Sequence, residues 1–227
     1  MKVCDLPYRR VTLEEIEKGM KDVIARVKNA KSVDEVLAAR QDYLALQTDY
    51  QTAASLSYMR YSINTVDEFY VAEKDYYDEI GPAAYNLKIE YEEALLDSPF
   101  RAELEKALLP LLFKAFEVER KTMSPEIIED MVEENKLVSE YSQLMAGMEF
   151  EFRGEKMPRT LLAKYYKDDD RATRREAYEA LGNGLAAHSE ALDGIFDKLV
   201  HVRDRIAKKM GYKNFVELGY YRMGRLC

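Results

Sequence analysis

Signals for helix starts recur along this chain and constrain its fold more than any other feature. A Ser or Thr followed three residues later by Glu forms a capping box, in which each side chain accepts a hydrogen bond from a free backbone N–H. The early part of the chain has such pairs at Thr12 with Glu15, Ser32 with Glu35, and Thr65 with Glu68. With only ten Gly and six Pro in 227 residues, turns are scarce, so the helices are expected to be long.

Proline positions extend this helical pattern along the chain. Pro is accepted at the first position of a helix, but inside a helix it removes a backbone hydrogen bond. Gly81-Pro82 and Pro110 fall inside helical stretches, so each is expected to kink or split its helix. Further helix starts are predicted at Ser98-Pro99, at Ser124-Pro125, and at Asn214 with Glu217.

The helical period is interrupted once. Met148 to Phe152 alternates apolar and acidic residues before Arg153-Gly154, which is typical of a half-buried strand leading into a turn. The sequence therefore predicts an all-α fold of long antiparallel helices with one short β-hairpin near 148–157. The predicted organisation is a helical bundle over 1–147, the hairpin over 148–158 and further helices over 159–227, all within one lobe.

An apolar seam follows the hairpin. Its members recur at alternating spacings of four and three residues, as in a heptad pattern. They are Leu181, Leu185, His188, Leu192, Ile195, Leu199, Val202 and Ile206. Gly182 and Gly184 each weaken a helix by about 1 kcal/mol relative to Ala, so we expect a bend or break near Asn183.

Charge and composition exclude several classes of protein. The chain has 42 acidic and 34 basic residues and a net charge of -8, with no basic cluster that would follow a phosphate backbone, so nucleic acid is not an expected partner. The longest nearly apolar run, Ala107 to Phe113, is too short to span a bilayer, and no membrane contact is expected. Cys4 and Cys227 stand alone at opposite ends, which excludes a disulfide framework. We expect a cytoplasmic protein.

The two histidines offer no metal-binding pattern. Neither belongs to an HExxH pair or to a Glu-x-x-His motif. His188 lies in the apolar seam, which favours a partly buried structural histidine over a role in a site. His201 has Asp197 and Arg205 four residues before and after it, which indicates a charged helix face. We assign no metal ligand and expect no cofactor in this chain.

Two further groups have a structural and a functional interpretation. Asp168 to Asp170 lacks the alternating ligands of a calcium loop, so capping of the following helix is favoured over cation binding. Glu and Asp residues are too numerous to single out a general acid and base, and we assign no catalytic residue. The chain also has 17 Tyr and no Trp. A helix interface is favoured over a peptide-binding groove for the cluster Tyr58, Tyr61, Tyr70, Tyr76 and Tyr77.

Several strings resemble a known family in their order along the chain. They are Arg60–Thr65, Ser124–Asp130 running into Glu134–Leu137, and Gly211–Arg225. These strings resemble the amino-terminal part of oligoendopeptidase F-like zinc metallopeptidases, within the thimet-oligopeptidase-like family. The resemblance covers nearly the whole chain, and the predicted hairpin lies where the family has a short β element.

The resemblance implies a two-lobed helical enzyme with a channel that admits short peptides. In the family, an HExxH helix and a following Glu hold zinc, and these residues have no counterpart in this chain. The resemblance therefore implies a chain that is truncated before HExxH and inactive alone, while the intact enzyme binds Zn²⁺. It identifies no catalytic or metal residue here, and it leaves the substrate-binding residues unknown.

We therefore expect the non-catalytic amino-terminal lobe of a zinc metallo-oligopeptidase. The alternative is an autonomous helical binding or scaffold protein that engages a partner through its Tyr-rich surfaces or its seam. A lobe without its counterpart would expose apolar faces, so self-association through residues 181–227 is expected. Within that region we expect Leu218, Tyr221 and Met223 to be poorly ordered or held by a second copy.

Overall fold

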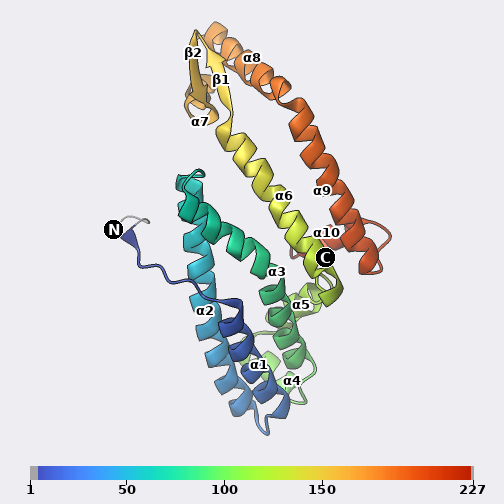
Figure 1. The fold of residues 1–227 in the computed structure, drawn as a ribbon. Helices are drawn as coiled ribbons and strands as arrows, with labels where there is room; N and C mark the ends of the chain where they lie inside the picture. The colour runs from blue at the N-terminus through green and yellow to red at the C-terminus, as the bar shows by residue number, and fades with distance from the viewer. Residues whose placement is uncertain (1–4, 226–227) are drawn as a thin grey trace. The chain divides into compact units, whose positions relative to one another are not determined.

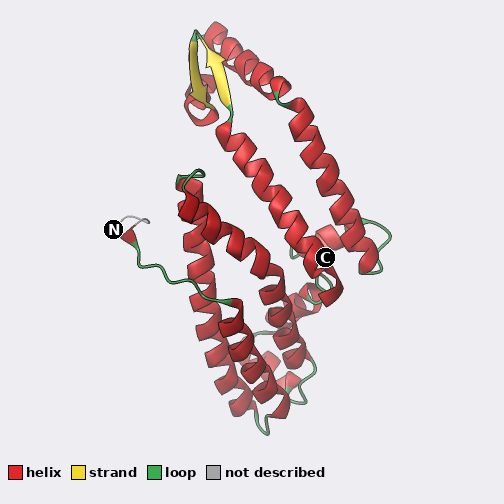
Figure 2. Cartoon of the chain, in the orientation of Figure 1, coloured by secondary structure: helices red, strands yellow, loops and turns green. Residues whose placement is uncertain are grey.

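A computed structural model describes residues 5–225, which form two compact units (Figure 1). One unit contains the described residues up to Glu133 and those from Arg203 onward, and the other contains Glu134–Val202. In sequence, the boundary between the units falls within α6 (Ile128–Gly147) and α9 (Ser189–Lys209). Figure 2 shows that, in residues 5–225, strands occur only in one hairpin and nearly everything else is helical. The predicted fold class is confirmed.

The first unit is built on three long helices that pack on one another. They are α1 (Leu13–Asn29), α2 (Val33–Ile63) and α3 (Glu68–Leu96). One apolar face of α1 is buried, and it includes Ile16, Met20, Val23 and Val27. Burying each such side chain contributes roughly 1.5–3 kcal/mol, which explains why the helices associate.

The helix starts of this unit follow the predicted capping signals in part. Thr12 and Glu15 form the complete capping box at the start of α1. Ser32 caps α2 by accepting from the Glu35 N–H at 3.3 Å. The predicted Thr65 start is wrong, because Asp67 caps α3 and accepts from the Tyr70 N–H at 3.0 Å.

The expectation that each proline kinks or splits its helix holds at Pro110, and α3, which contains Pro82, bends without splitting. Pro110 splits its helix, because α4 (Arg101–Leu108) ends before Leu109 and α5 (Pro110–Glu119) begins after it. Pro82 does not split α3, which continues past it and changes direction in its middle part (Figure 1). The predicted start at Ser98-Pro99 is also wrong. The Ser98 hydroxyl accepts from the Phe100 N–H in a turn, and α4 begins only at Arg101.

The remaining helices of this unit start where the sequence predicts. Ser124 caps the short helix η2 (Pro125–Ile127), which leads directly into α6. Asn214 caps α10 (Phe215–Arg222) by accepting from the Val216 N–H at 3.0 Å. Leu218 of α10 is fully buried, and α10 packs on α5 of its own chain. The expectation that Leu218 is poorly ordered or held by a second copy is therefore wrong.

The second unit is organised around the predicted hairpin. Strands β1 (Glu149–Phe152) and β2 (Glu155–Pro158) pair antiparallel, with Phe150 opposite Met157 and Phe152 opposite Glu155. One face of the hairpin packs on the helices that follow it in the chain. These are α7 (Arg159–Leu162), η3 (Ala163–Lys167) and α8 (Arg171–Ala187). The buried core of this unit comprises Met148, Phe150, Phe152, Met157, Leu162, Ala177 and Ala180.

The helical break in the seam lies later than predicted. α8 continues through Gly182, Asn183 and Gly184 and ends at His188, and α9 begins at Ser189. A Cβ on Gly184 would lie 2.4 Å from the Phe150 ring, so this glycine permits close packing of α8 on β1. Close packing on the hairpin thus outweighs the low helix propensity of glycine. No described helix is long and apolar enough to cross a bilayer.

Candidate functional site

The two histidines have structural positions. His188 is half-buried at the end of α8, and its Nδ1 lies 2.9 Å from the Gly184 carbonyl oxygen. His201 is exposed, with its Nδ1 2.8 Å from the Asp197 carbonyl oxygen. Arg205 pairs with Asp130 rather than with the histidine face. Neither histidine lies in a group of possible metal ligands within residues 5–225.

Of the three consecutive aspartates, Asp170 caps α8, in line with the favoured interpretation. Asp170 accepts from the backbone N–H groups of Ala172 and Thr173 at 3.2 and 3.0 Å. Hydrogen bonds from Thr173 and Ala172 hold the pKa of Asp170 below its usual range. The Asp168 carboxylate accepts from the Asp170 N–H. These carboxylate oxygens therefore already have backbone donors.

Two of the clustered tyrosines hold the chain's own N-terminal segment against α3. The Tyr77 hydroxyl accepts from the Val11 N–H at 3.0 Å, and the Tyr76 hydroxyl accepts from the Leu13 N–H at 3.1 Å. Phenols in this cluster do bind a peptide backbone, but it is the backbone of this chain. This finding supports the helix-interface interpretation at these positions.

A charged network completes this attachment. Glu73 of α3, which is buried, accepts hydrogen bonds from the Tyr8 hydroxyl and from the Arg10 guanidinium. The bond from Arg10, aided by that from Tyr8, lowers the pKa of Glu73 despite burial. Arg60 of α2 donates to the Leu6 carbonyl oxygen at 2.6 Å. The N-terminal segment is thus fixed on both α2 and α3.

A second buried carboxylate lies between α3 and α5. Glu92 is only 1% exposed, and Lys88 Nζ lies 3.0 Å from its Oε1. Lys88 also pairs with Glu119 of α5. Burial, aided by the nearby Glu119 carboxylate, raises the pKa of Glu92 to about 7 against the opposite effect of Lys88. The second carboxylate oxygen, Oε2, is buried without a hydrogen-bond partner. Local sequence does not indicate this group, since Lys88 and Glu92 have the four-residue spacing of an ordinary surface pair.

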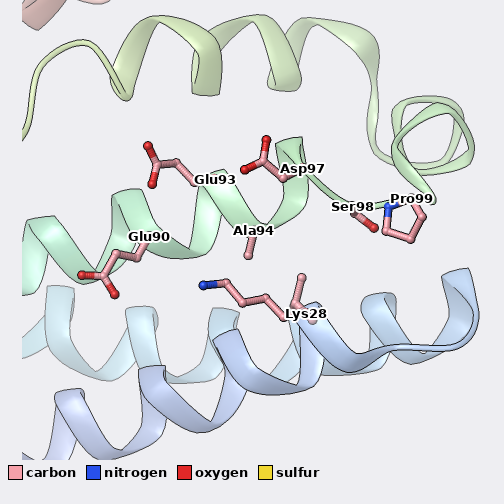
Figure 3. A pocket seen from close by; sticks show the side chains of 8 residues that line it. Lys28, Glu90, Glu93, Ala94, Asp97, Ser98 and Pro99 are labelled. Carbon is pink, nitrogen blue, oxygen red and sulfur yellow. The ribbon is translucent and has the colours of Figure 1, made fainter.

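An acidic pocket of about 190 Å³ lies between α1 and the end of α3. Figure 3 shows that Lys28 of α1 lies on one side of α3, whereas the Glu93 and Asp97 carboxylates point to the other side. These two carboxylates therefore point away from Lys28. They do not form a group of possible metal ligands.

The second unit contains an apolar groove of about 410 Å³. We define the apolar groove by its lining residues, which are Tyr141 of α6 and Leu192, Asp193, Ile195, Phe196 and Leu199 of α9. Phe196 is 69% exposed, and Tyr141 is 45% exposed. Exposed aromatic side chains beside a hollow are typical of a surface that binds another molecule.

A larger cleft of about 500 Å³ lies beside the hairpin. We define the hairpin cleft by its lining residues, which are Glu149, Glu151, Arg153, Gly154, Lys156, Ala180, Asn183 and Gly184. Arg153 closes one part of it, since its guanidinium bonds to Glu176 and Thr173 of α8 at 2.7 and 2.6 Å. The cleft combines charged side chains with a floor of small residues from α8.

The described residues contain hollows but no grouped metal ligands. Groups of three or more His, Cys, Asp or Glu side chains placed to hold a metal ion do not occur in residues 5–225. Cys4 and Cys227 lie outside the described residues. The residues present therefore do not fit a zinc ion, and the two unassigned hollows are the candidate functional surfaces.

Comparisons with known proteins identify relatives of this chain. The profile of the Peptidase M3 N-terminal domain matches residues 4–123, more than half of the chain. Two solved structures, one described as an oligoendopeptidase F and one as PZ peptidase A with an inhibitor, are each 39% identical over 99% of this chain, with TM-scores of 0.94. A structure described as an oligoendopeptidase F from Bacillus anthracis is 39% identical over 98%, with a TM-score of 0.92. No curated protein matches significantly.

The match to these structures is partial on their side. This chain spans only 40 to 41% of the length of their chains. Nearly all of this chain therefore corresponds to a minor part of each longer protein.

Proposed function

Because this chain belongs to the Peptidase M3 family and corresponds to an N-terminal part of an oligoendopeptidase F-like peptidase, we propose that it is the non-catalytic lobe of a zinc metallo-oligopeptidase. The intact enzyme hydrolyses short peptides within an enclosed channel, and this lobe forms one wall of that channel. The catalytic residues and the Zn²⁺ ligands belong to the remainder of the enzyme. We propose that the enzyme works in the cytoplasm.

One observation carries this proposal. The chain is 39% identical to oligoendopeptidase F structures over nearly its whole length, yet it spans only about two fifths of theirs. Its described residues offer no set of metal ligands. We therefore assign peptide binding to this lobe and the zinc-dependent hydrolysis to the rest of the enzyme. The hairpin cleft and the apolar groove are the surfaces with which this lobe can meet a peptide or the second lobe.

Reconstitution tests the proposal. The remaining part of the Bacillus anthracis relative is produced separately and mixed with this chain, and zinc-dependent hydrolysis of a quenched fluorescent peptide is measured. We expect hydrolysis by the mixture and none by this chain alone, since a catalytic zinc needs three protein ligands. A mixture that forms a complex yet stays inactive in the presence of zinc contradicts the proposal, as does zinc-dependent hydrolysis by this chain alone.

We also propose that the chain on its own associates with a second copy through the apolar groove. Phe196 and Tyr141 are exposed beside a hollow that an aromatic side chain can enter. Of the expected region 181–227, this proposal retains the seam in α9 and not α10, whose Leu218 is buried, and it adds Tyr141 of α6.

A further inference from the structure

The turn of the hairpin determines which backbone groups of β1 face outward. Arg153 and Gly154 both have positive φ, 53° and 82°, as a two-residue type I′ turn requires. In such a hairpin, the residues that flank the turn form a hydrogen-bonded pair, and bonded and non-bonded pairs then alternate. Phe152 with Glu155 and Phe150 with Met157 are therefore the bonded pairs.

The two glutamates of β1 occupy the alternate positions. Glu149 lies opposite Pro158 and Glu151 lies opposite Lys156, so their N–H and C=O groups point away from β2. Pro158 agrees with this assignment, because proline has no N–H to give and is tolerated where none is needed. Backbone hydrogen bonds outside the strand ladder do not involve Glu149 or Glu151 in the described structure. The outer edge of β1 therefore presents unused donors and acceptors.

The hairpin cleft lies at this edge. Glu149 and Glu151 line it from β1, and Ala180, Asn183 and Gly184 line it from α8. Figure 1 shows β1 between β2 and α8, in agreement with the packing of α8 on β1. Ala180 and Gly184 are small residues and leave space beside β1. The volume of the hairpin cleft, about 500 Å³, provides room for a further segment beside the strand.

The charge of the two glutamates favours a basic binding partner. Glu149 and Glu151 are both exposed, and neither takes part in an ion pair within the described residues. Two basic side chains also line the cleft, of which Arg153 already pairs with Glu176 and Lys156 lies opposite Glu151 on β2. A side chain directly opposite a glutamate on a neighbouring strand is favoured when it is basic.

We propose that the outer edge of β1 binds an extended peptide segment by strand addition, with basic side chains of the peptide opposite Glu149 and Glu151. The main-chain groups of the glutamates supply the affinity, and their carboxylates select the sequence. This inference rests on the proposed function and deepens it, since it places the peptide on a particular element of the lobe and gives its chemistry.

The first test uses the full chain and a fluorescein-labelled seven-residue peptide that alternates Val and Lys. We expect saturable binding by fluorescence anisotropy, together with slower hydrogen exchange of the Glu149 and Glu151 amides. The same peptide with N-methyl groups on its Lys amides cannot pair with β1 while keeping Lys opposite the glutamates, and we expect it to bind about tenfold more weakly. Equal binding of the two peptides, or no saturable binding by the unmodified peptide, overturns the proposal.

The second test uses two variants at one position. Glu151→Pro removes an N–H that the hairpin itself does not use, whereas Glu151→Gln keeps the N–H and removes the charge. We expect the proline variant to lose about tenfold in affinity and the glutamine variant clearly less. Equal losses in both variants would show that charge alone binds the peptide. If thermal melting shows that Glu151→Pro does not fold, the comparison of the methylated and unmodified peptides on the wild-type chain tests strand addition instead.

Both tests use this chain without a catalytic partner. If the peptide does not bind to β1, the result of the reconstitution experiment is unaffected. If reconstitution fails, the peptide-binding result is unaffected. The two proposals can therefore fail independently.

Discussion

Glu92 holds a carboxylate in the interior of the first unit with one oxygen unsatisfied. Lys88 contacts its other oxygen and also pairs with Glu119 of α5, so the cluster joins α3 to α5. Two tyrosines also lie near the Glu92 carboxylate, with Arg40 beside them. Tyr43 and Tyr91 stack with ring centroids 3.8 Å apart, Arg40 donates to the Tyr91 hydroxyl, and burial raises the pKa of Tyr43. A charge at Glu92 is therefore poorly solvated.

Stability is expected to depend on pH through this group. The pKa of Glu92 is about 7 in the folded chain and near 4.5 when unfolded. Its contribution is fully present below pH 4.5 and is lost as pH rises through 7, by about 3 kcal/mol. We expect Glu92→Gln to raise the free energy of unfolding at pH 8 by ~1–3 kcal/mol and to have little effect at pH 4.5. Denaturant titrations at both pH values measure this.

Glu93→Gln is the matched control, because Glu93 is the exposed neighbour of Glu92. It should change stability by less than about 0.5 kcal/mol at either pH. Loss of stability at pH 8 in Glu92→Gln would mean that the ionised carboxylate supports Lys88 more than burial opposes it.

At the scale of elements, the two glycines of α8 have opposite roles. A Cβ on Gly184 would meet the Phe150 ring at 2.4 Å, whereas a Cβ on Gly182 would meet nothing within 4 Å. We expect Gly184→Ala to lower the free energy of unfolding by about 1–3 kcal/mol through overpacking. Gly182→Ala should raise it by about 0.5–1 kcal/mol through helix propensity. Thermal or denaturant unfolding measures both, and destabilisation by Gly182→Ala would contradict the role assigned to it.

The same glycines show how far the sequence predicts the elements. Local signals located α1, the split at Pro110 and the start of α10, because capping and proline chemistry act within one turn. Local signals could not show that the Phe150 ring packs on Gly184, so the break was expected near Asn183 and lies at His188. Thr65 also satisfies the capping spacing, but Asp67 takes the position.

The candidate surfaces were less predictable than the helices. The alternation over Met148 to Phe152 predicted the hairpin, and the turn residues Arg153-Gly154 then determine which backbone groups face outward. The hairpin cleft also depends on α8, which begins only at Arg171. The burial of Glu92 depends on α2 and α5 in the same way. Tertiary packing that joins distant segments leaves no trace in local spacing.

At the scale of the whole molecule, family membership rests on strings spread along the chain, and the profile match and the 39% identity confirm it. The division of the described residues into two compact units was not predicted, because its boundary falls inside α6 and α9, where helical periodicity is uninterrupted. Each unit has its own buried cluster, so each supplies its own packing energy. The exposed surface that remains decides how the chain behaves in solution.

The apolar groove and α10 give contrasting predictions for self-association. Phe196 is 69% exposed, so Phe196→Glu removes an apolar surface without disturbing a core, and we expect a shift toward monomer in sedimentation with an unchanged melting temperature. Leu218 is fully buried, so Leu218→Glu places a charge in the interior and should lower stability by about 3 kcal/mol or more. Phe69→Glu is a control for an exposed aromatic residue elsewhere, at 51% exposure, and should change neither property. If wild type and Phe196→Glu sediment alike, the apolar groove does not join two copies of the chain.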